Sequence, residues 1–310
     1  MDTRYGCLVS TIGLLHPGEM GAAIGAALRS AGHEVLWASE GRSAVTVERA
    51  QAAGLTDLGT IDALAQRAEV VISVVPPHAA ADMVGRFSGY GGLYIDANAI
   101  SPETARTIAF GPRFVDGGIV GPPPQRAGTT RLYLSGPEAE AAAELFSGTN
   151  VDAPVVSAEI GAASAVKMAY AAWTKGTAAL LLNVRALARA EGVESTLLAE
   201  WQLSQPQLKA SSDAAARSAL GKGWRWEGEM DEIAATFAAA GLPDGFHRAA
   251  AEIYARSPHG DVGGDDPLDQ VLGALLPVRD TALDTGDAAP VTEAGESDRP
   301  VRRLFRRDPA

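Results

Sequence analysis

Cysteine is almost missing from this chain of 310 residues, in which Cys7 is the only one. A single cysteine excludes an intramolecular disulfide and a zinc site built from several cysteines. This usage fits a reducing compartment, and we expect a cytoplasmic protein without a metal centre. The stretch "MDTRYGCLVSTIG" at the start also lacks the basic residues and long apolar core of a secretory signal.

Long hydrophobic runs and an excess of positive charge are missing as well. No uncharged apolar stretch approaches the roughly 18 residues of a membrane-spanning helix, so we expect no membrane partner. The formal net charge of −12 disfavours nucleic acid as a partner. The hydrophobic share of 46% is ordinary for a globular protein, and the length suggests two domains of roughly 100–200 residues. We therefore expect a small-molecule substrate.

The first half of the chain alternates β-rich runs with helical patterns. Strands are expected at "STIGLL", "HEVLWA", "AEVVISVVPP", "GGLYIDANAISP", "RFVDGGIV" and "RLYLSG". Helices are expected between them, one ending at Gly32 and others beginning at Ser43 and Ser101. The alternation predicts an α/β fold with a parallel sheet over residues 1–156.

From Ser157 onward the pattern is helical. "AEIGAASAVKMAYAAWTKGTAALLLNVRALARAEG" contains no proline and predicts one long helix, and "DEIAATFAAAGLPDGFHRAAAEIYARS" predicts at least two more. We expect an all-helical domain over residues 157–258, joined to the sheet by the long helix. Residues 259–310 are rich in Pro, Gly and Asp with a basic end, which predicts a disordered tail apart from a short helix at "LDQVLGALL".

The stretch "IGLLHPGEMG", residues 12–21, carries the first functional hypothesis. It follows an apolar run and opens a helix, where a dinucleotide-binding loop of the form G-x-G-x-x-G would lie. Gly18 and Gly21 fit the second and third glycines, whereas His16 stands at the first. A strand, a turn and a helix N-terminus offer free amides and a favourable dipole to a phosphate. An ordinary strand-to-helix turn is the alternative.

The stretch "SEGRS", residues 39–43, ends the second strand, where such folds bind the adenosine ribose. An acidic residue there binds a free 2′-hydroxyl, whereas Arg with Ser accommodates a 2′-phosphate. Glu40 therefore argues for NAD, and Arg42 with Ser43 argues for NADP. We favour NADP because Glu40 can turn outward. A solvated polar turn remains the other interpretation.

Lys167 lies inside the apolar long helix, on the face shared by Ser164 and Thr174. It either extends to solvent or lies in a cleft, where it could exchange a proton with a carbonyl or hydroxyl group. The small residues before it, Gly161 to Ala163, would let a flat ligand approach the helix backbone.

Together these residues resemble the β-hydroxyacid dehydrogenase family, which includes 3-hydroxyisobutyrate dehydrogenase, the 6-phosphogluconate dehydrogenases and, more distantly, the imine reductases. The similarity covers about residues 10–257 and follows the family's order of motifs. "IGLLHPGEMG" resembles the loop G-x-I-G-x-G-x-M-G, "SVVPPHAAADM" the segment beneath the coenzyme riboses, and "DANAISP" the motif D-x-S-x-x-x-P. "FVDGGIVGPPP" resembles the substrate stretch D-A-P-V-S-G-G, and "GAASAVK" matches G-x-G-x-x-x-K.

The resemblance implies a Rossmann-type domain followed by a helical domain, and it assigns roles to particular residues. The implied catalytic residue is Lys167. The implied coenzyme-binding residues are His16, Pro17, Gly18, Glu19, Met20, Gly21, Arg42, Ser43, Val75, Pro76 and Asn98. The implied substrate-binding residues are Asn98, Gly118, Ile119, Val120, Gly121 and Tyr170. Val120 and Pro122 depart from the family's substrate stretch, and Tyr170 and Ala171 replace two asparagines.

The implied activity is hydride transfer between NADP(H), with NAD as the alternative coenzyme, and a small polar carbonyl or alcohol, with Lys167 as general acid or base. Imine reduction on the same fold is one alternative, and a non-catalytic NADP-binding regulatory protein is another, because the substrate stretch is altered. The resemblance also implies a homodimer through the helical domains. Glu229 lies near the family's Lys-Asp dipeptide, although a charged helix start would explain it equally well.

Overall fold

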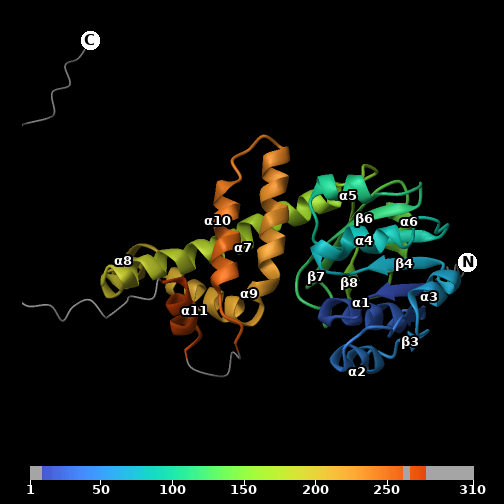
Figure 1. The fold of residues 1–310 in the computed structure, drawn as a ribbon, viewed down its shortest axis with the longest axis horizontal. Coiled ribbons are helices and arrows are strands. Elements are labelled where there is room, and N and C mark those ends of the chain that lie inside the picture. The colour runs from blue at the N-terminus through green and yellow to red at the C-terminus, as the bar shows by residue number, and fades with distance from the viewer. Residues whose placement is uncertain (1–8, 261–265, 277–310) are drawn as a thin grey trace, which may run out of the picture. The chain divides into compact units, whose positions relative to one another are not determined.

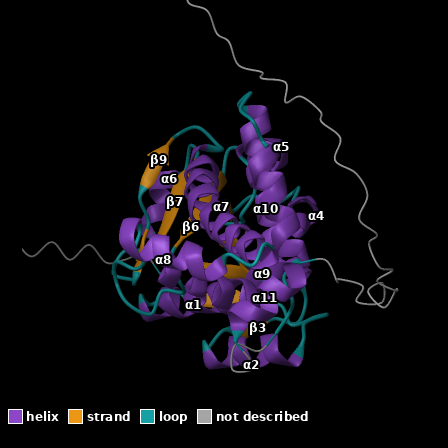
Figure 2. Ribbon diagram, turned by 90° about the vertical axis from the view of Figure 1, so that its left-hand side faces the viewer, coloured by secondary structure: helices purple, strands orange, loops and turns teal. Residues whose placement is uncertain are grey.

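The structure, a computed structural model, describes residues 9–260 and 266–276. A sheet with flanking helices forms its first half, and helices alone form its second half (Figures 1 and 2). The predicted α/β fold, a Rossmann-type sheet followed by helices, is confirmed.

One sheet contains all the strands, in the order β3-β2-β1-β4-β5-β6-β7-β8, with β9 also paired to β7. The pair β6 and β7 is antiparallel, and the other pairs are parallel. The strands are β1 (Thr11–Leu15), β2 (Glu34–Trp37), β3 (Thr56–Asp57), β4 (Val70–Ser73), β5 (Leu93–Asp96), β6 (Phe114–Val120), β7 (Thr130–Ser135), β8 (Val151–Asp152) and β9 (Val155–Ser157). The order reverses direction between β1 and β4, which is where doubly wound folds bind ligands.

Short helices connect the strands. They are α1 (Glu19–Ser30), α2 (Ala44–Ala52), α3 (Ile61–Arg67), the 3-10 turn η1 (Pro77–Ala79), α4 (Ala80–Gly85), α5 (Pro102–Ile108) and α6 (Ala139–Glu144). The predicted helix starts are confirmed, since the Ser43 and Ser101 hydroxyls accept hydrogen bonds from amides three residues later. Gly32 follows the end of α1 with φ +99°, as its predicted terminal position requires.

Alternate side chains of β1 enter cores on opposite faces of the sheet. Ile12 and Leu14 pack with the core that contains Leu28 of α1, whereas Leu15 packs with the core that contains Leu64 of α3. Apolar burial on both faces is expected of a parallel sheet covered by helices.

The helical half is arranged around α7 (Ala162–Ala190), whose 29 residues make it roughly 43 Å long. The other helices are α8 (Glu194–Ser204), α9 (Leu208–Ala239), α10 (Gly245–Arg256) and α11 (Pro267–Leu275). Figure 1 shows α7 running from the sheet into the group formed by α9, α10 and α11. Met168 and Leu182 of α7 share one core with Ile233 of α9 and Tyr254 of α10. The prediction of one long helix is confirmed.

The predicted tail begins too early. The short helix expected at "LDQVLGALL" is present as α11, and it buries Leu268, Val271, Leu272 and Leu275 in the helical core. The helical half therefore continues beyond residue 258, because these four apolar side chains are buried by packing against α7 and α9. The predicted tail beyond Leu276, including its basic end, lies outside the described residues. The expected domain boundary near residue 156 stays a prediction.

A buried carboxylate joins β6 to the start of α7. Asp116 accepts hydrogen bonds from the amides of Gly161 and Ser164, both at 3.0 Å, and from the hydroxyls of Ser164 and Ser135. The first amides of a helix have no partner within the helix, and a negative charge there also complements the helix dipole. Asp116 therefore caps α7 from the neighbouring sheet and fixes the position of its first turn.

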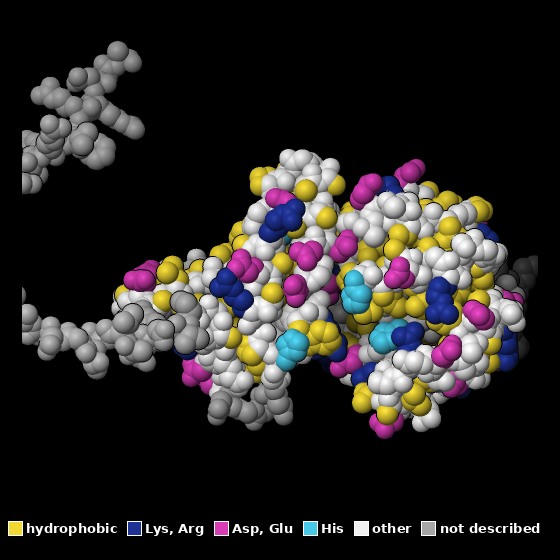
Figure 3. All heavy atoms as spheres, in the orientation of Figure 1, with side chains coloured by type: hydrophobic (Ala, Val, Ile, Leu, Met, Phe, Trp, Pro, Cys, Tyr) yellow, Lys and Arg dark blue, Asp and Glu magenta, His cyan; other side chains and the backbone are white. Residues whose placement is uncertain are grey.

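Charge is distributed evenly over the visible surface. On the face in Figure 3, acidic and basic side chains are interspersed without a broad area of one sign. Among residues 9–260 and 266–276, no helix has the length and apolar character that crossing a membrane requires.

We expect Asp116→Asn to lower the free energy of unfolding by about 2–4 kcal/mol, because a neutral amide replaces a buried acceptor of four hydrogen bonds. Urea unfolding at neutral pH measures this change. Asp152→Asn, at an exposed position on β8, is the matched control and should change the value by less than about 0.5 kcal/mol. Equal effects of the two substitutions would contradict the capping role.

Candidate active site

The turn between β1 and α1 has the geometry of an anion site. The Gly18 amide donates to the His16 carbonyl at 2.8 Å, and the Ala22 amide donates to the Gly18 carbonyl at 2.9 Å. A Cβ on Gly21 would lie 2.6 Å from the His16 carbonyl oxygen, so this close approach requires glycine. The amides of residues 19–21 precede the first intrahelical bond and point out of the helix N-terminus.

His16 itself has a backbone conformation that favours glycine, with φ +68°. Its ring lies over the turn, since Nε2 is 3.4 Å from the position that a Cβ on Gly18 would take. Arg42 Nη1 donates to His16 Nδ1 at 3.2 Å. Burial lowers the pKa of His16, and the positive charges of Arg42 and two further arginines lower it more. The imidazole is therefore neutral near pH 7 and can accept this hydrogen bond.

The end of β2 presents the residues that would distinguish NAD from NADP. Ser43 is the N-cap of α2, so its hydroxyl is partly used by the Thr46 amide. Glu40 is exposed, as the preference for NADP assumed. Arg42 turns inward to His16, and its Nε is buried with no hydrogen-bond partner among the described residues. A buried guanidinium donor without a partner is able to receive an anion.

The segment after β4 lies beside the β1–α1 turn. Val75 is buried and Pro76 is exposed, and the Cβ of neighbouring Val74 is 3.7 Å from the position of a Cβ on Gly21. The structure thus places both predicted coenzyme segments at the carboxyl ends of the adjacent strands β1 and β4. Their roles in binding stay predictions.

Asn98 is hydrogen-bonded within the fold, and its expected role at the nicotinamide and substrate stays a prediction. Its side chain is buried, donates to Asp96 at 2.8 Å and to Ser73 at 3.1 Å, and accepts from the Val75 amide at 2.6 Å. These bonds use both amide hydrogens, so none is left for a ligand. Burial raises the pKa of Asp96, the carboxyl beneath it, to about 7. Asn98 therefore connects the end of β5 to the segment after β4 and stabilises the conformation of that segment.

Lys167 and the predicted substrate stretch meet where β6 passes α7. A Cβ on Gly118 would lie 2.9 Å from the Lys167 Cβ and 2.6 Å from the Ala163 carbonyl oxygen. Only glycine permits this approach of strand and helix, and the first turn that Asp116 caps comes directly before it. The Lys167 side chain is only 17% exposed.

The Ile119 side chain belongs to the sheet core, Val120 is buried, and Gly121 has φ +115° and approaches the Thr129 carbonyl. Their predicted contacts with substrate stay predictions. A Cβ on Gly161 would lie 2.6 Å from the Arg106 guanidinium of α5. The approach of a flat ligand to the small residues before Lys167 also stays a prediction.

Two lysines of α7 share one carboxylate of α9. Glu229 pairs with Lys175 at hydrogen-bond distance, and its Oε2 lies 3.9 Å from Lys167 Nζ. Burial lowers the pKa of Lys175 to about 8, against the opposing effect of Glu229. Burial alone would raise the pKa of Glu229, but the charges of Lys175 and Lys167 outweigh it and lower that pKa. The three side chains are each less than one-fifth exposed and carry a net positive charge.

Sequence reasoning missed Lys175 and misread Glu229. The helix-start interpretation of Glu229 is wrong, because α9 begins at Leu208 and Glu229 lies in its interior. Lys175 lies two turns after Lys167 and is held over the Trp226 ring at 5.3 Å. A second lysine in an otherwise apolar helix was the available signal. Tyr170, proposed to replace a lost asparagine, is 49% exposed, and its role stays a prediction.

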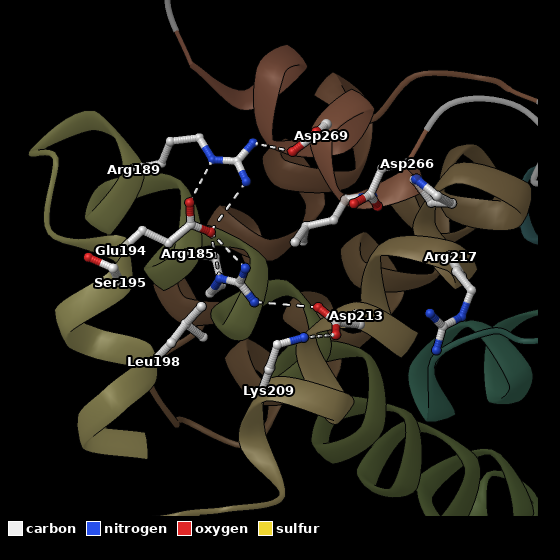
Figure 4. A pocket seen from close by; sticks show the side chains of 12 residues that line it. Arg185, Arg189, Glu194, Ser195, Leu198, Lys209, Asp213, Arg217, Asp266 and Asp269 are labelled. Carbon is white, nitrogen blue, oxygen red and sulfur yellow. Dashed lines mark hydrogen bonds and ion pairs between the residues drawn. The ribbon is translucent and has the colours of Figure 1, made fainter. Parts of the chain in front are cut away.

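A cavity of about 520 Å³ in the helical half is lined largely by charged side chains. Figure 4 shows its charged side chains pointing toward one another: Arg185 pairs with Glu194 and Asp213, and Arg189 pairs with Glu194 and Asp269. These pairs connect α7, α8, α9 and α11. These ion pairs connect four helices, and we infer that they stabilise the packing of the helical half.

Comparison with known families matches both halves of the chain. The family described as the NAD binding domain of 6-phosphogluconate dehydrogenase matches residues 9–145, which include the β1–α1 turn. A domain of unknown function (DUF1932) matches residues 188–257. A conserved protein of unknown function with structural similarity to 3-hydroxyacid dehydrogenases is 29% identical, with a TM-score of 0.58 over 79% of this chain and 98% of that one.

The two matched segments together fit the β-hydroxyacid dehydrogenase family.

Two further proteins are similar to this chain: one is uncharacterised, and the other has a lower sequence identity. The uncharacterized 28.5 kDa protein in 7S RNA 5′ region of Methanothermus fervidus is 30% identical over 169 residues, which cover 53% of this chain and 66% of that protein. Mycobacterium tuberculosis 3-hydroxyisobutyrate dehydrogenase, solved with L-serine, has the same fold at 20% identity and a TM-score of 0.60, over 86% of this chain and 99% of that one. The family resemblance predicted from the motifs is confirmed, and His16 is this member's departure from the glycine of the family loop.

Proposed function

We propose that this protein is an NADP(H)-dependent oxidoreductase that acts on a small polar carbonyl or alcohol. The observation that carries the proposal is the pairing of two features within one fold. A turn with free amides and an unpartnered arginine donor lies at the ends of β1 and β2, and a shielded lysine lies against β6. The first suits a phosphorylated coenzyme, and the second suits proton transfer.

The residues present fit a nicotinamide coenzyme. The glycine at position 18 presents only backbone atoms beneath the His16 ring, and Gly21 permits the sharp turn that dinucleotide loops need. Arg42 Nε is a buried donor that a 2′-phosphate would satisfy. When bound, the coenzyme would supply or accept the hydride.

The chain's own contribution to the chemistry centres on Lys167. In reduction its ammonium group would donate a proton to the substrate oxygen, and in oxidation its amine would remove the hydroxyl proton. Glu229 holds the lysine pair close to the substrate stretch, and the net positive charge of the three groups favours a substrate with a polar or anionic part. Gly118 of that stretch lies close to Lys167, since a Cβ there would be 2.9 Å from the Lys167 Cβ.

We also propose the homodimer that the family implies. Three large apolar side chains of α7, Trp173, Leu180 and Leu187, are exposed at intervals of seven residues and so share one helix face. Val193 before α8 and Leu203 of α8 are exposed apolar residues as well. An exposed apolar helix face is typical of a protein interface, and a second copy would cover it.

The first test is a fluorescence titration of the purified protein with NADPH and, separately, with NADH. We expect tighter binding of NADPH, and we expect Arg42→Ala to weaken it by about 10- to 100-fold while leaving NADH nearly unchanged, because a charge-assisted contact to phosphate is lost. Arg113→Ala, at an exposed residue just before the amino end of β6, is the control. Preference for NADH would assign the ribose to Glu40, and binding of neither coenzyme would contradict the proposed function.

Lys167→Ala should abolish turnover in a screen of short carbonyl compounds, alcohols and imines while leaving NADPH affinity nearly intact, because the lysine acts on substrate. Steady-state rates and the same titration measure the two effects separately. Lys209→Ala, at an exposed lysine of α9, should change neither. Loss of coenzyme affinity together with turnover would make Lys167 a structural residue.

Sedimentation velocity tests the interface on α7. The full chain should sediment at twice its own mass, and Leu180→Lys should shift it toward monomer, because burying an unpaired charge in an apolar interface is unfavourable. Val45→Lys, at an exposed apolar residue of α2, should leave the mass unchanged. A wild-type monomer at micromolar concentration would contradict the dimer.

A further inference from the structure

We infer that His16 is a specificity-determining residue, which holds the Arg42 guanidinium in place for the 2′-phosphate of NADP. The inference rests on the proposed function, since it assumes that the β1–α1 turn binds this class of coenzyme. It gives a residue of the β1–α1 turn a part in recognising the 2′-phosphate, which would bind at the end of the neighbouring strand β2.

The backbone at position 16 is the first observation. Among the described residues, His16 is the only non-glycine with a positive φ, at +68°. A side chain in this region is strained, and glycine would adopt the conformation freely. The histidine side chain must therefore make contacts that offset the strain.

The hydrogen bond to Arg42 is such a contact. Strands β1 and β2 are parallel neighbours, so the segments at their carboxyl ends meet at the same edge of the sheet. Arg42 Nη1 donates to His16 Nδ1 at 3.2 Å, which uses one of the five guanidinium donors. Nε is buried with no partner among residues 9–260 and 266–276. The guanidinium is thus held in one orientation with donor capacity left for an anion.

The protonation state of His16 suits this role. Burial lowers its pKa, and the charges of Arg42, Arg49 and Arg225 lower it further. The neutral ring offers Nδ1 as an acceptor, whereas a protonated ring would donate there and repel Arg42. Three arginines act on the neutral imidazole, and one of them, Arg225, pairs with Glu19 at 3.6 Å. The charges of Arg42 and Arg49 favour a phosphate group here.

A different role for the same ring makes a different prediction. Nε2 lies over Gly18, where it could donate to the pyrophosphate that NAD and NADP share. Loss of that contact would weaken both coenzymes equally. The ratio of the two dissociation constants therefore separates positioning of Arg42 from direct contact with pyrophosphate.

The experiment measures the dissociation constants of NADPH and NADH by fluorescence for the wild type, His16→Gly, His16→Asn, Arg42→Ala and the double variant His16→Gly with Arg42→Ala. We expect His16→Gly to reduce the preference for NADPH by about tenfold with little change for NADH. His16→Asn should retain most of the preference, because asparagine tolerates a positive φ and its side-chain oxygen can accept from Arg42. In the Arg42→Ala background, His16→Gly should have no further effect on the ratio.

Four results would overturn the inference. Equal weakening of both coenzymes in His16→Gly would assign His16 to the pyrophosphate, and unchanged dissociation constants for both coenzymes would show that Arg42 is held by other contacts. A wild type that binds NADH as tightly as NADPH would remove the specificity but leave the oxidoreductase proposal intact. Binding of neither coenzyme by the wild type would instead overturn the proposed function and the inference together. Circular dichroism of each variant verifies that it is folded.

Discussion

At the carboxyl end of β5 and in the middle of β6, two buried aspartates occupy paired positions, Asp96 and Asp116. Asp116 accepts hydrogen bonds from two amides at the start of α7, and these bonds fix the position of the residues that follow in that helix. The helix α7 and the strand β6 then lie so close together that position 118 has no room for a side chain, and glycine stands there. Lys167 lies against β6 because the first turn of its helix is fixed to the sheet. The position of this lysine therefore depends on the capping hydrogen bonds of Asp116.

Charges on α9 link the two halves a second time. Glu232 accepts from the Ser101 amide at 2.6 Å and from the Thr104 hydroxyl at 3.2 Å, at the start of α5. Glu229, one turn earlier on the same helix, faces the lysines of α7. One face of α9 thus supplies acidic groups both to a helix N-terminus of the sheet half and to the lysine pair.

Local signals made most of the fold predictable from the sequence. Alternating apolar runs, serine caps and the long proline-free helix are set by neighbouring residues, and the structure contains them at nearly the expected positions. The start of the tail was misplaced because α11 is stabilised by distant helices. The composition of residues 259–310 indicates a polar segment, but it does not indicate that α7 and α9 bury the four apolar side chains of α11.

The candidate site was only partly predictable. His16, Arg42 and Lys167 could be found because each interrupts a local pattern: a histidine among glycines, a cation after a strand, a charge in an apolar helix. The pairing of His16 with Arg42 and of Lys175 with Glu229 joins residues 26 and 54 positions apart. No periodicity encodes such contacts. Asn98 is the opposite case, because its motif was found in the sequence but the hydrogen bonds of its side chain to Ser73 and Asp96 could not be predicted from it.

The placement of the lysine pair has a mechanical consequence. Lys167 is held against β6 by the capped end of α7, whereas its counter-ion Glu229 belongs to α9 and so to the helical half. Any sliding of α9 along α7 would change the 3.9 Å separation of ammonium and carboxylate without moving the ammonium away from the sheet. The ion pair of Lys167 with Glu229 thus depends on the position of α9 along α7, whereas the contact of Lys167 with β6 does not.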